Sequence, residues 1–90
     1  MTNDPAEQAI LDLVTERGPE KSICPTDAAR RLAGNPADEA WRSKLSPIRL
    51  AAQRLAKAGK IDILRKGKKI APEDARGVIR LRLKPGGAED

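Results

Sequence analysis

The positions of proline and glycine constrain the fold most strongly, because they divide the 90 residues into short segments. Proline is tolerated in the first turn of a helix, and glycine often follows the last helical residue. Three segments begin near a proline, end at a glycine and carry apolar residues at helical spacing. They predict a helix over 5–17, a short helix that begins at Pro25 and ends before Gly34, and a helix over 47–58.

Polar residues at the segment starts support these helices. Asp4 before Pro5 is a typical N-cap, and Ser46 before Pro47 is another. Asn35-Pro36 opens a further segment, which predicts a brief helix near 37–44. Because proline inside a helix removes a hydrogen bond, we expect the next helix to start at Pro47.

Two later segments alternate apolar and polar residues, which is typical of strands with one buried face. Ile61 and Ile63 lie in the first, and 79–83 forms the second. They predict a hairpin with a long connection, "KGKKIAPEDARG", and such long loops are usually functional or mobile. The stretch 22–24 is short, and it could pair at a sheet edge.

This order of elements predicts a mainly α protein with a small antiparallel β-hairpin, a winged helix-turn-helix of three helices plus a wing. We expect one domain over 1–84 and a flexible tail over 85–90. An alternative is a three-helix bundle with a loose C-terminal ribbon, although two strands alone are marginal in water. The predicted core is Ile10, Leu13, Leu32, Trp41, Ile48, Leu55, Ile61, Ile63, Ile79 and Leu81.

The charge is unevenly distributed. Residues 1–41 hold four Lys/Arg and eight Asp/Glu, whereas residues 42–84 hold fourteen Lys/Arg and three Asp/Glu. A strongly positive half attracts polyanions, of which nucleic acid is the commonest. The alternative is a solvated surface rich in Lys and Arg.

Five stretches have a recognisable pattern: "SICPTDAARRL" at 22–32, "WRSKL" at 41–45, "IRLAAQRLAKAGKI" at 48–61, "RKGK" at 65–68 and "RGVIRL" at 76–81. Together they resemble a small bacterial family of uncharacterised function that is predicted to be a winged helix. The resemblance covers most of 6–83 and implies a fold only. The wider winged-helix class suggests DNA binding, but a shared fold is weak support for a shared function.

The composition argues against an enzyme. The chain has no His and no Tyr, and its one cysteine has no histidine to activate it. Zinc sites need several Cys or His ligands, so we expect no metal and no cofactor. Cys24 stands where a helix start could activate a thiol, but a small buried apolar group is the commoner role. Trp41 could stack on a base, but its helical spacing favours the core.

The outer side of helix 47–58 carries the candidate base-reading residues, Arg49, Gln53, Arg54 and Lys57. Arginine and glutamine read guanine and adenine edges in the major groove, and lysine suits phosphate. An ordinary polar helix face is the alternative. Leu50 also falls on that side, where it could contact a thymine methyl, a partner protein or nothing.

The connection between the two strands carries the second candidate set. Gly67 permits a turn with positive φ, so the neighbouring cations would project from a wing tip. They are Arg65, Lys66, Lys68 and Lys69, and the positive surface continues through Arg76, Arg80 and Arg82. These residues predict phosphate contacts with duplex DNA, as in a transcription regulator.

Two other functions stay open. The Leu50 face and the acidic first helix would suit a protein-interaction module, and the basic half would also suit RNA. Few aromatic residues argue against base stacking on single-stranded RNA. We expect a cytoplasmic monomer, since the start "MTNDPAEQAI" lacks signal-peptide features and no apolar run could span a membrane.

Overall fold

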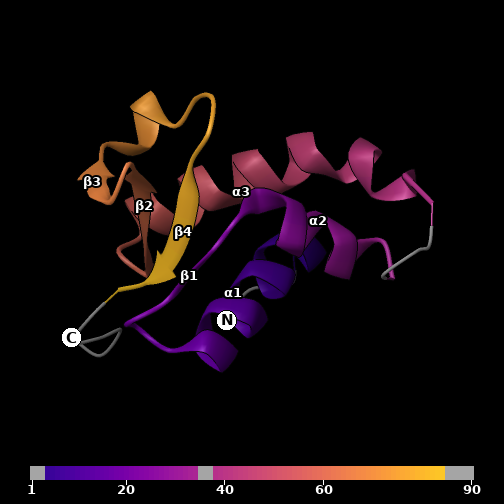
Figure 1. Ribbon diagram of the computed structural model, residues 1–90, viewed down its shortest axis with the longest axis horizontal. Helices are drawn as coiled ribbons and strands as arrows, with labels where there is room; N and C mark the ends of the chain where they lie inside the picture. The colour runs from indigo at the N-terminus through magenta and orange to yellow at the C-terminus, as the bar shows by residue number, and fades with distance from the viewer. Residues whose placement is uncertain (1–3, 35–37, 85–90) are drawn as a thin grey trace.

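The computed structural model describes residues 4–34 and 38–84, and it shows three α-helices and a four-stranded antiparallel sheet (Figure 1). This arrangement confirms the predicted winged helix-turn-helix. In chain order the elements are α1 (Pro5–Arg17), β1 (Ser22–Ile23), α2 (Pro25–Leu32), the 3-10 helix η1 (Ala40–Lys44), α3 (Leu45–Lys57), β2 (Ile61–Arg65), β3 (Lys68–Ile70), the 3-10 helix η2 (Pro72–Asp74) and β4 (Arg80–Leu83). The predicted tail 85–90 and the predicted start at Asn35-Pro36 lie outside the described residues.

The first two helices begin and end as their local sequences predict. The Asp4 carboxylate accepts a hydrogen bond from the Ala6 amide at 2.9 Å, which caps α1 at the predicted residue. Gly18, with φ of 86°, ends it. At the start of α2 the Asp27 carboxylate accepts from the Cys24 amide at 3.2 Å. Cys24 is half-buried, so it is less buried than the small buried group that the sequence favoured.

The third helix differs from its predicted bounds. It starts at Leu45, two residues before the expected Pro47, because it continues directly from η1. Pro47 is its third residue. In the first turn of a helix the amide has no helical partner, so proline costs no hydrogen bond there. Ser46 is therefore a helical residue and not the cap.

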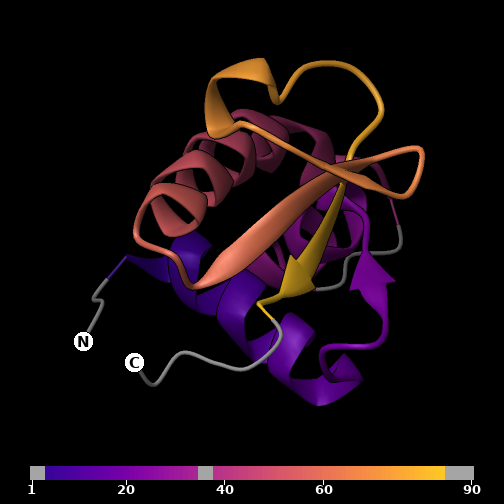
Figure 2. The same cartoon turned by 90° about the vertical axis from the view of Figure 1, so that its left-hand side faces the viewer.

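The sheet has the order β1-β4-β2-β3, with every neighbouring pair antiparallel. The predicted pairing of the two alternating segments is correct, with Ile61 opposite Leu83 and Ile63 opposite Leu81. The short segment before α2 pairs with β4 at the edge, also as expected. The connection, however, is not a loose loop, because β3 folds back on β2 and η2 follows it (Figure 2).

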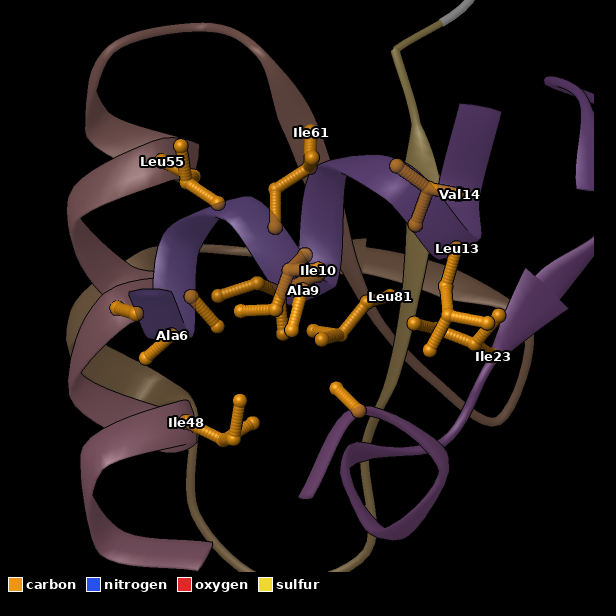
Figure 3. Close-up of a cluster of buried hydrophobic side chains, with 14 of the residues drawn as sticks. Ala6, Ala9, Ile10, Leu13, Val14, Ile23, Ile48, Leu55, Ile61 and Leu81 are labelled. Carbon is orange, nitrogen blue, oxygen red and sulfur yellow. The ribbon is translucent and has the colours of Figure 1, made fainter. Parts of the chain in front are cut away.

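The core lies between the helices and one face of the sheet. Figure 3 shows Ile10 of α1, Ile48 and Leu55 of α3, and Leu81 of β4 pointing into the same interior. The strands are therefore docked on the helices, and the alternative of a helical bundle with a loose ribbon is wrong. Of the predicted core, only Leu32 and Trp41 are partly exposed. Two guanidinium groups lie over the Trp41 ring, those of Arg30 at 5.0 Å and Arg42 at 5.2 Å from the ring centre.

The central strand β2 is buried on both faces, contrary to the single buried face that alternation predicts. Asp62 and Leu64, on the face away from the helices, are exposed by only 4% and 7%. Arg82 and Lys69, on the two neighbouring strands, lie 2.9 and 3.5 Å from the Asp62 carboxylate. Among the described residues, no helix combines the length and apolar character needed to cross a bilayer.

Candidate nucleic-acid interface

The exposed row of α3 is set by helical spacing from its buried side. Ile48, Ala51, Ala52 and Leu55 face the core, so Ser46, Leu50, Gln53 and Lys57 form the opposite row. Leu50 is 57% exposed there, as the sequence predicted. Arg49 and Arg54 lie on the two flanks of this row, and each has a partner elsewhere in the fold.

Arg49 connects α3 to the segment between β2 and β4, residues 66–79, which we call the wing. Its Nη2 donates to the Gly77 carbonyl oxygen at 3.0 Å. The η2 turn of the wing packs against α3 as well, and Ala75 beside it is buried in the core (Figures 1 and 2). The two candidate sets, on the helix and on the wing, therefore belong to adjoining surfaces.

Arg54 lies on the other flank and bonds to α1. Its Nε donates to the Glu7 carboxylate at 2.6 Å, and its Nη2 donates to the Asp4 carboxylate. The hydrogen bond to Glu7, with the charges of both acids, raises the pKa of Arg54 above its ordinary value. Its charge is balanced within the protein, so the structure separates Arg54 from the other predicted site residues.

The tip of the wing is a two-residue turn. Lys66 has φ of 53° and Gly67 has φ of 81°, which is the conformation of the tight hairpin turn that matches strand twist. The expected positive φ at Gly67 is confirmed. A lysine in this region is uncommon and carries a modest conformational cost. Lys66 and Lys68 are both exposed, on either side of Gly67.

Arg65, at the end of β2, supports the wing from within. Its Nη2 donates to the carbonyl oxygens of Asp74 at 2.7 Å and Arg76 at 2.8 Å. These two bonds hold the segment after η2 against the sheet. The side chain is thus a structural element of the wing, and the sequence had suggested only a phosphate contact. Arg76 itself has an exposed side chain next to Gly77.

Arg80, on β4, is held in a similar way. Its Nε donates to the Ser22 hydroxyl at 2.5 Å and its Nη2 to the Ser22 carbonyl at 2.9 Å. These bonds join the side chain to the edge strand β1. Both acceptors are neutral, so the guanidinium keeps its full positive charge.

The buried Asp62 forms ion pairs with two cations, and its single negative charge offsets one of their two positive charges. Its carboxylate accepts from Arg82 Nη2 at 2.9 Å, and the Lys69 ammonium lies 3.5 Å away. Sequence analysis treated Arg82 and Lys69 as surface charges and missed this group. The signal was the aspartate between two isoleucines of a predicted strand, where an acid at a central position needs a cationic partner.

Val78 is the other residue that sequence analysis missed. It is 88% exposed in the wing, next to the predicted contact residues. In the parts of the chain that the structure describes, no three acidic, cysteine or histidine side chains form a group that could hold a metal ion.

A family described as "Protein of unknown function (DUF3253)" matches residues 3–84. A search of the curated proteins found no match.

Proposed function

We propose that this chain, which belongs to the DUF3253 family of unknown function, binds duplex DNA through α3 and the wing. In the proposed complex the row Leu50, Gln53 and Lys57 enters the major groove, and the wing contacts the phosphate backbone. A cytoplasmic, bacterial transcription regulator would use such an interface. The bond between Arg49 and the Gly77 carbonyl is the observation that carries the proposal, because it joins the two surfaces.

Charge supports the proposal. The charged groups of Lys57, Lys66, Lys68 and Arg76 have no hydrogen-bond or ion-pair partner within 4–34 and 38–84. Cations without internal partners can neutralise phosphates and release the counterions condensed on DNA. Arg54 and Arg82 are left out of the proposed contacts, since carboxylates already neutralise them.

The first test measures affinity for a fluorescently labelled duplex by anisotropy at several salt concentrations. Four to six phosphate contacts predict a log–log salt slope of about −4 to −5. Lys66→Ala with Lys68→Ala should make the slope shallower by about 2, equally for all sequences. Arg17→Ala with Lys21→Ala removes the same charge from α1 and the following loop and should leave the slope unchanged. A weak, salt-independent signal from the unmodified protein would rule the proposal out.

The second test concerns base reading. Gln53→Ala should change the preference between duplex sequences, because glutamine pairs with an adenine edge and one such contact discriminates by about 1–3 kcal/mol. The readout is a competition with a randomised duplex pool followed by sequencing of the bound fraction. If both proteins select the same duplex sequences, α3 does not read bases in the complex.

RNA binding is distinguished by a parallel titration with a structured RNA of equal charge. The proposal expects tighter binding to duplex DNA. If the RNA binds more tightly, the basic surface serves RNA instead.

Exposure of Leu50 at 57% favours a second candidate, a protein-interaction surface on α3. An apolar side chain in the middle of the exposed row would lose contact with a protein partner when changed to Asp. Affinity purification of a partner by the unmodified protein, and its loss with Leu50→Asp, would support this function. A partner that the Leu50→Asp protein retains would contradict it.

A further inference from the structure

A groove of about 550 Å³ opens between the tip of the wing and the sheet edge. It lies between segments far apart in the sequence, and its lining residue Gly77 also accepts the hydrogen bond from Arg49 of α3. Its walls come from the β2–β3 turn, the segment 76–78, β4 and β1. They are Ser22, Leu64, Arg65, Lys66, Gly67, Arg76, Gly77, Val78 and Arg80.

The charge of this groove is uniform. Four of its lining side chains are cationic and none is acidic. Arg65 and Arg80 are oriented by carbonyl and hydroxyl oxygens, which direct a guanidinium without neutralising it. A guanidinium has five N–H donors, so each of the two keeps donors for a ligand. Each of these fixed arginines lines the groove as a pre-organised donor for an acidic group.

The groove also has an apolar part. The Leu64 side chain lies at its base, 7% exposed, and Val78 stands at its mouth, 88% exposed. Gly67 and Gly77 line it with backbone only, and a Cβ at either position would meet no atom within 4 Å. The result is open space beside an apolar surface, with cations at its edge. Small-molecule sites commonly combine an apolar lining with a few fixed polar groups at this size.

We propose that this groove binds a small amphipathic anion, with a flat apolar body and one carboxylate, sulfonate or phosphate group. The apolar body lies against Leu64 and Val78, and the acidic group accepts hydrogen bonds from Arg65 and Arg80. Nothing in this inference requires DNA binding, and it stands or falls separately from the proposed function.

The probe for the experiment is 8-anilinonaphthalene-1-sulfonate, which has an apolar aromatic body and one acidic group. Its fluorescence rises when the rings leave water, so a titration into the folded protein should show saturable binding with one site per chain. N-phenyl-1-naphthylamine has the same rings and no sulfonate. We expect it to bind about tenfold or more weakly, because it cannot use the arginines. Equal affinity of the two probes would overturn the proposal.

A matched pair of variants locates the site. Val78→Glu places an acid at the mouth of the groove. It should lower the affinity for the sulfonate probe at least about tenfold, through charge repulsion and the loss of an apolar contact. Leu50→Glu makes the same change at the exposed position on α3 and should leave the affinity within about twofold. Both positions are exposed, so neither change disturbs the core. An equal loss in both variants would show that the probe binds exposed apolar groups in general.

A second readout comes from backbone amide chemical shifts during the same titration. The amides of Gly67 and Gly77 should shift, whereas those of Gly18 and Gly34, on the helical side of the molecule, should stay in place. A titration that moves all four alike, or none, contradicts binding in the groove. Competition of the bound probe by hexanoate, benzoate and adenosine monophosphate then ranks carboxylate against phosphate as the preferred acidic group.

Discussion

Two arginines of the helices, Arg31 and Arg54, and the two arginines that flank the wing differ in what holds them. On the helices, Arg31 bonds to Glu16 through two contacts of 2.8 and 3.1 Å, and Arg54 bonds to Asp4 and Glu7. At the strand ends that flank the wing, Arg65 and Arg80 donate to backbone carbonyls and a serine hydroxyl. The first group is neutralised and the second is only oriented. Charge that the sequence counts equally is therefore neutralised at Arg31 and Arg54 and remains available to a ligand at Arg65 and Arg80.

One arginine of the sheet is an exception to this comparison, because Arg82 is paired with an acid, the buried Asp62. Asp62→Ala should destabilise the fold by about 3 kcal/mol, since it leaves a partly buried guanidinium without its carboxylate. Urea unfolding measures this loss. Asp74→Ala removes an exposed acid from η2 and should change the free energy of unfolding by less than about 0.5 kcal/mol. Similar changes in the free energy of unfolding for the two variants would show that the buried ion pair of Asp62 does not stabilise the fold more than an exposed acid does.

Removing the arginine that holds the wing segment, Arg65, should have the next largest effect on stability. Arg65→Ala loses two hydrogen bonds to backbone carbonyls and should cost about 2 kcal/mol. Hydrogen exchange at 75–78 should speed up more than exchange in α1. Arg65→Lys should not restore protection, because an ammonium cannot reproduce the fork of a guanidinium. Full protection in the lysine variant would mean that charge alone orders the wing.

On the helical side, Arg54→Ala should have a smaller effect that depends on salt. The side chain is half exposed, so its ion pairs are screened by dissolved ions. We expect a lower melting temperature than the unmodified protein at low salt and little difference at high salt. Arg65→Ala provides the contrast. Because Arg65 bonds to neutral acceptors, this variant should lower the melting temperature by the same amount at low and at high salt. A salt-independent effect of Arg54→Ala would remove the distinction between the two regions.

The smallest expected effect concerns pH. The hydrogen bond from Arg31 holds the pKa of Glu16 below its ordinary value of 4.5. Because the folded state binds this proton less tightly than the unfolded state, the pair stabilises the fold above the ordinary pKa. That contribution disappears as pH falls through the lowered, folded-state pKa. Glu16→Gln should therefore be slightly less stable near neutral pH and equally stable in strong acid, as thermal melts across this range would show.

Much of the fold could be predicted from neighbouring residues. The cap at Asp4, the pairing of the two alternating segments and the turn at Gly67 each depend on short stretches of chain. The start of α3 could not be predicted, because a proline such as Pro47 fits the first position of a helix as well as the third. Strand β3 was missed since its residues, Lys68 to Ile70, have no apolar alternation to mark them.

The candidate site was predicted less completely than the fold. Helical spacing placed Leu50, Gln53 and Lys57 on the outer row of α3, and the structure agrees with that placement. The sequence offered no means of finding Val78, because a single exposed valine in a loop belongs to no periodic pattern. It also could not separate Arg54 from Arg49, which differ only in the flank of the helix that each occupies.

The sequence by itself determined where α1, α2, β2 and β4 form, because capping, periodicity and turn conformation act between residues only a few positions apart. Only the tertiary structure decided which cations remain available. Arg54 meets Glu7 across 47 positions and Arg80 meets Ser22 across 58. A hydrogen bond requires its atoms within about 3 Å, and the packing of α1 on α3 and of β1 on β4 sets that distance.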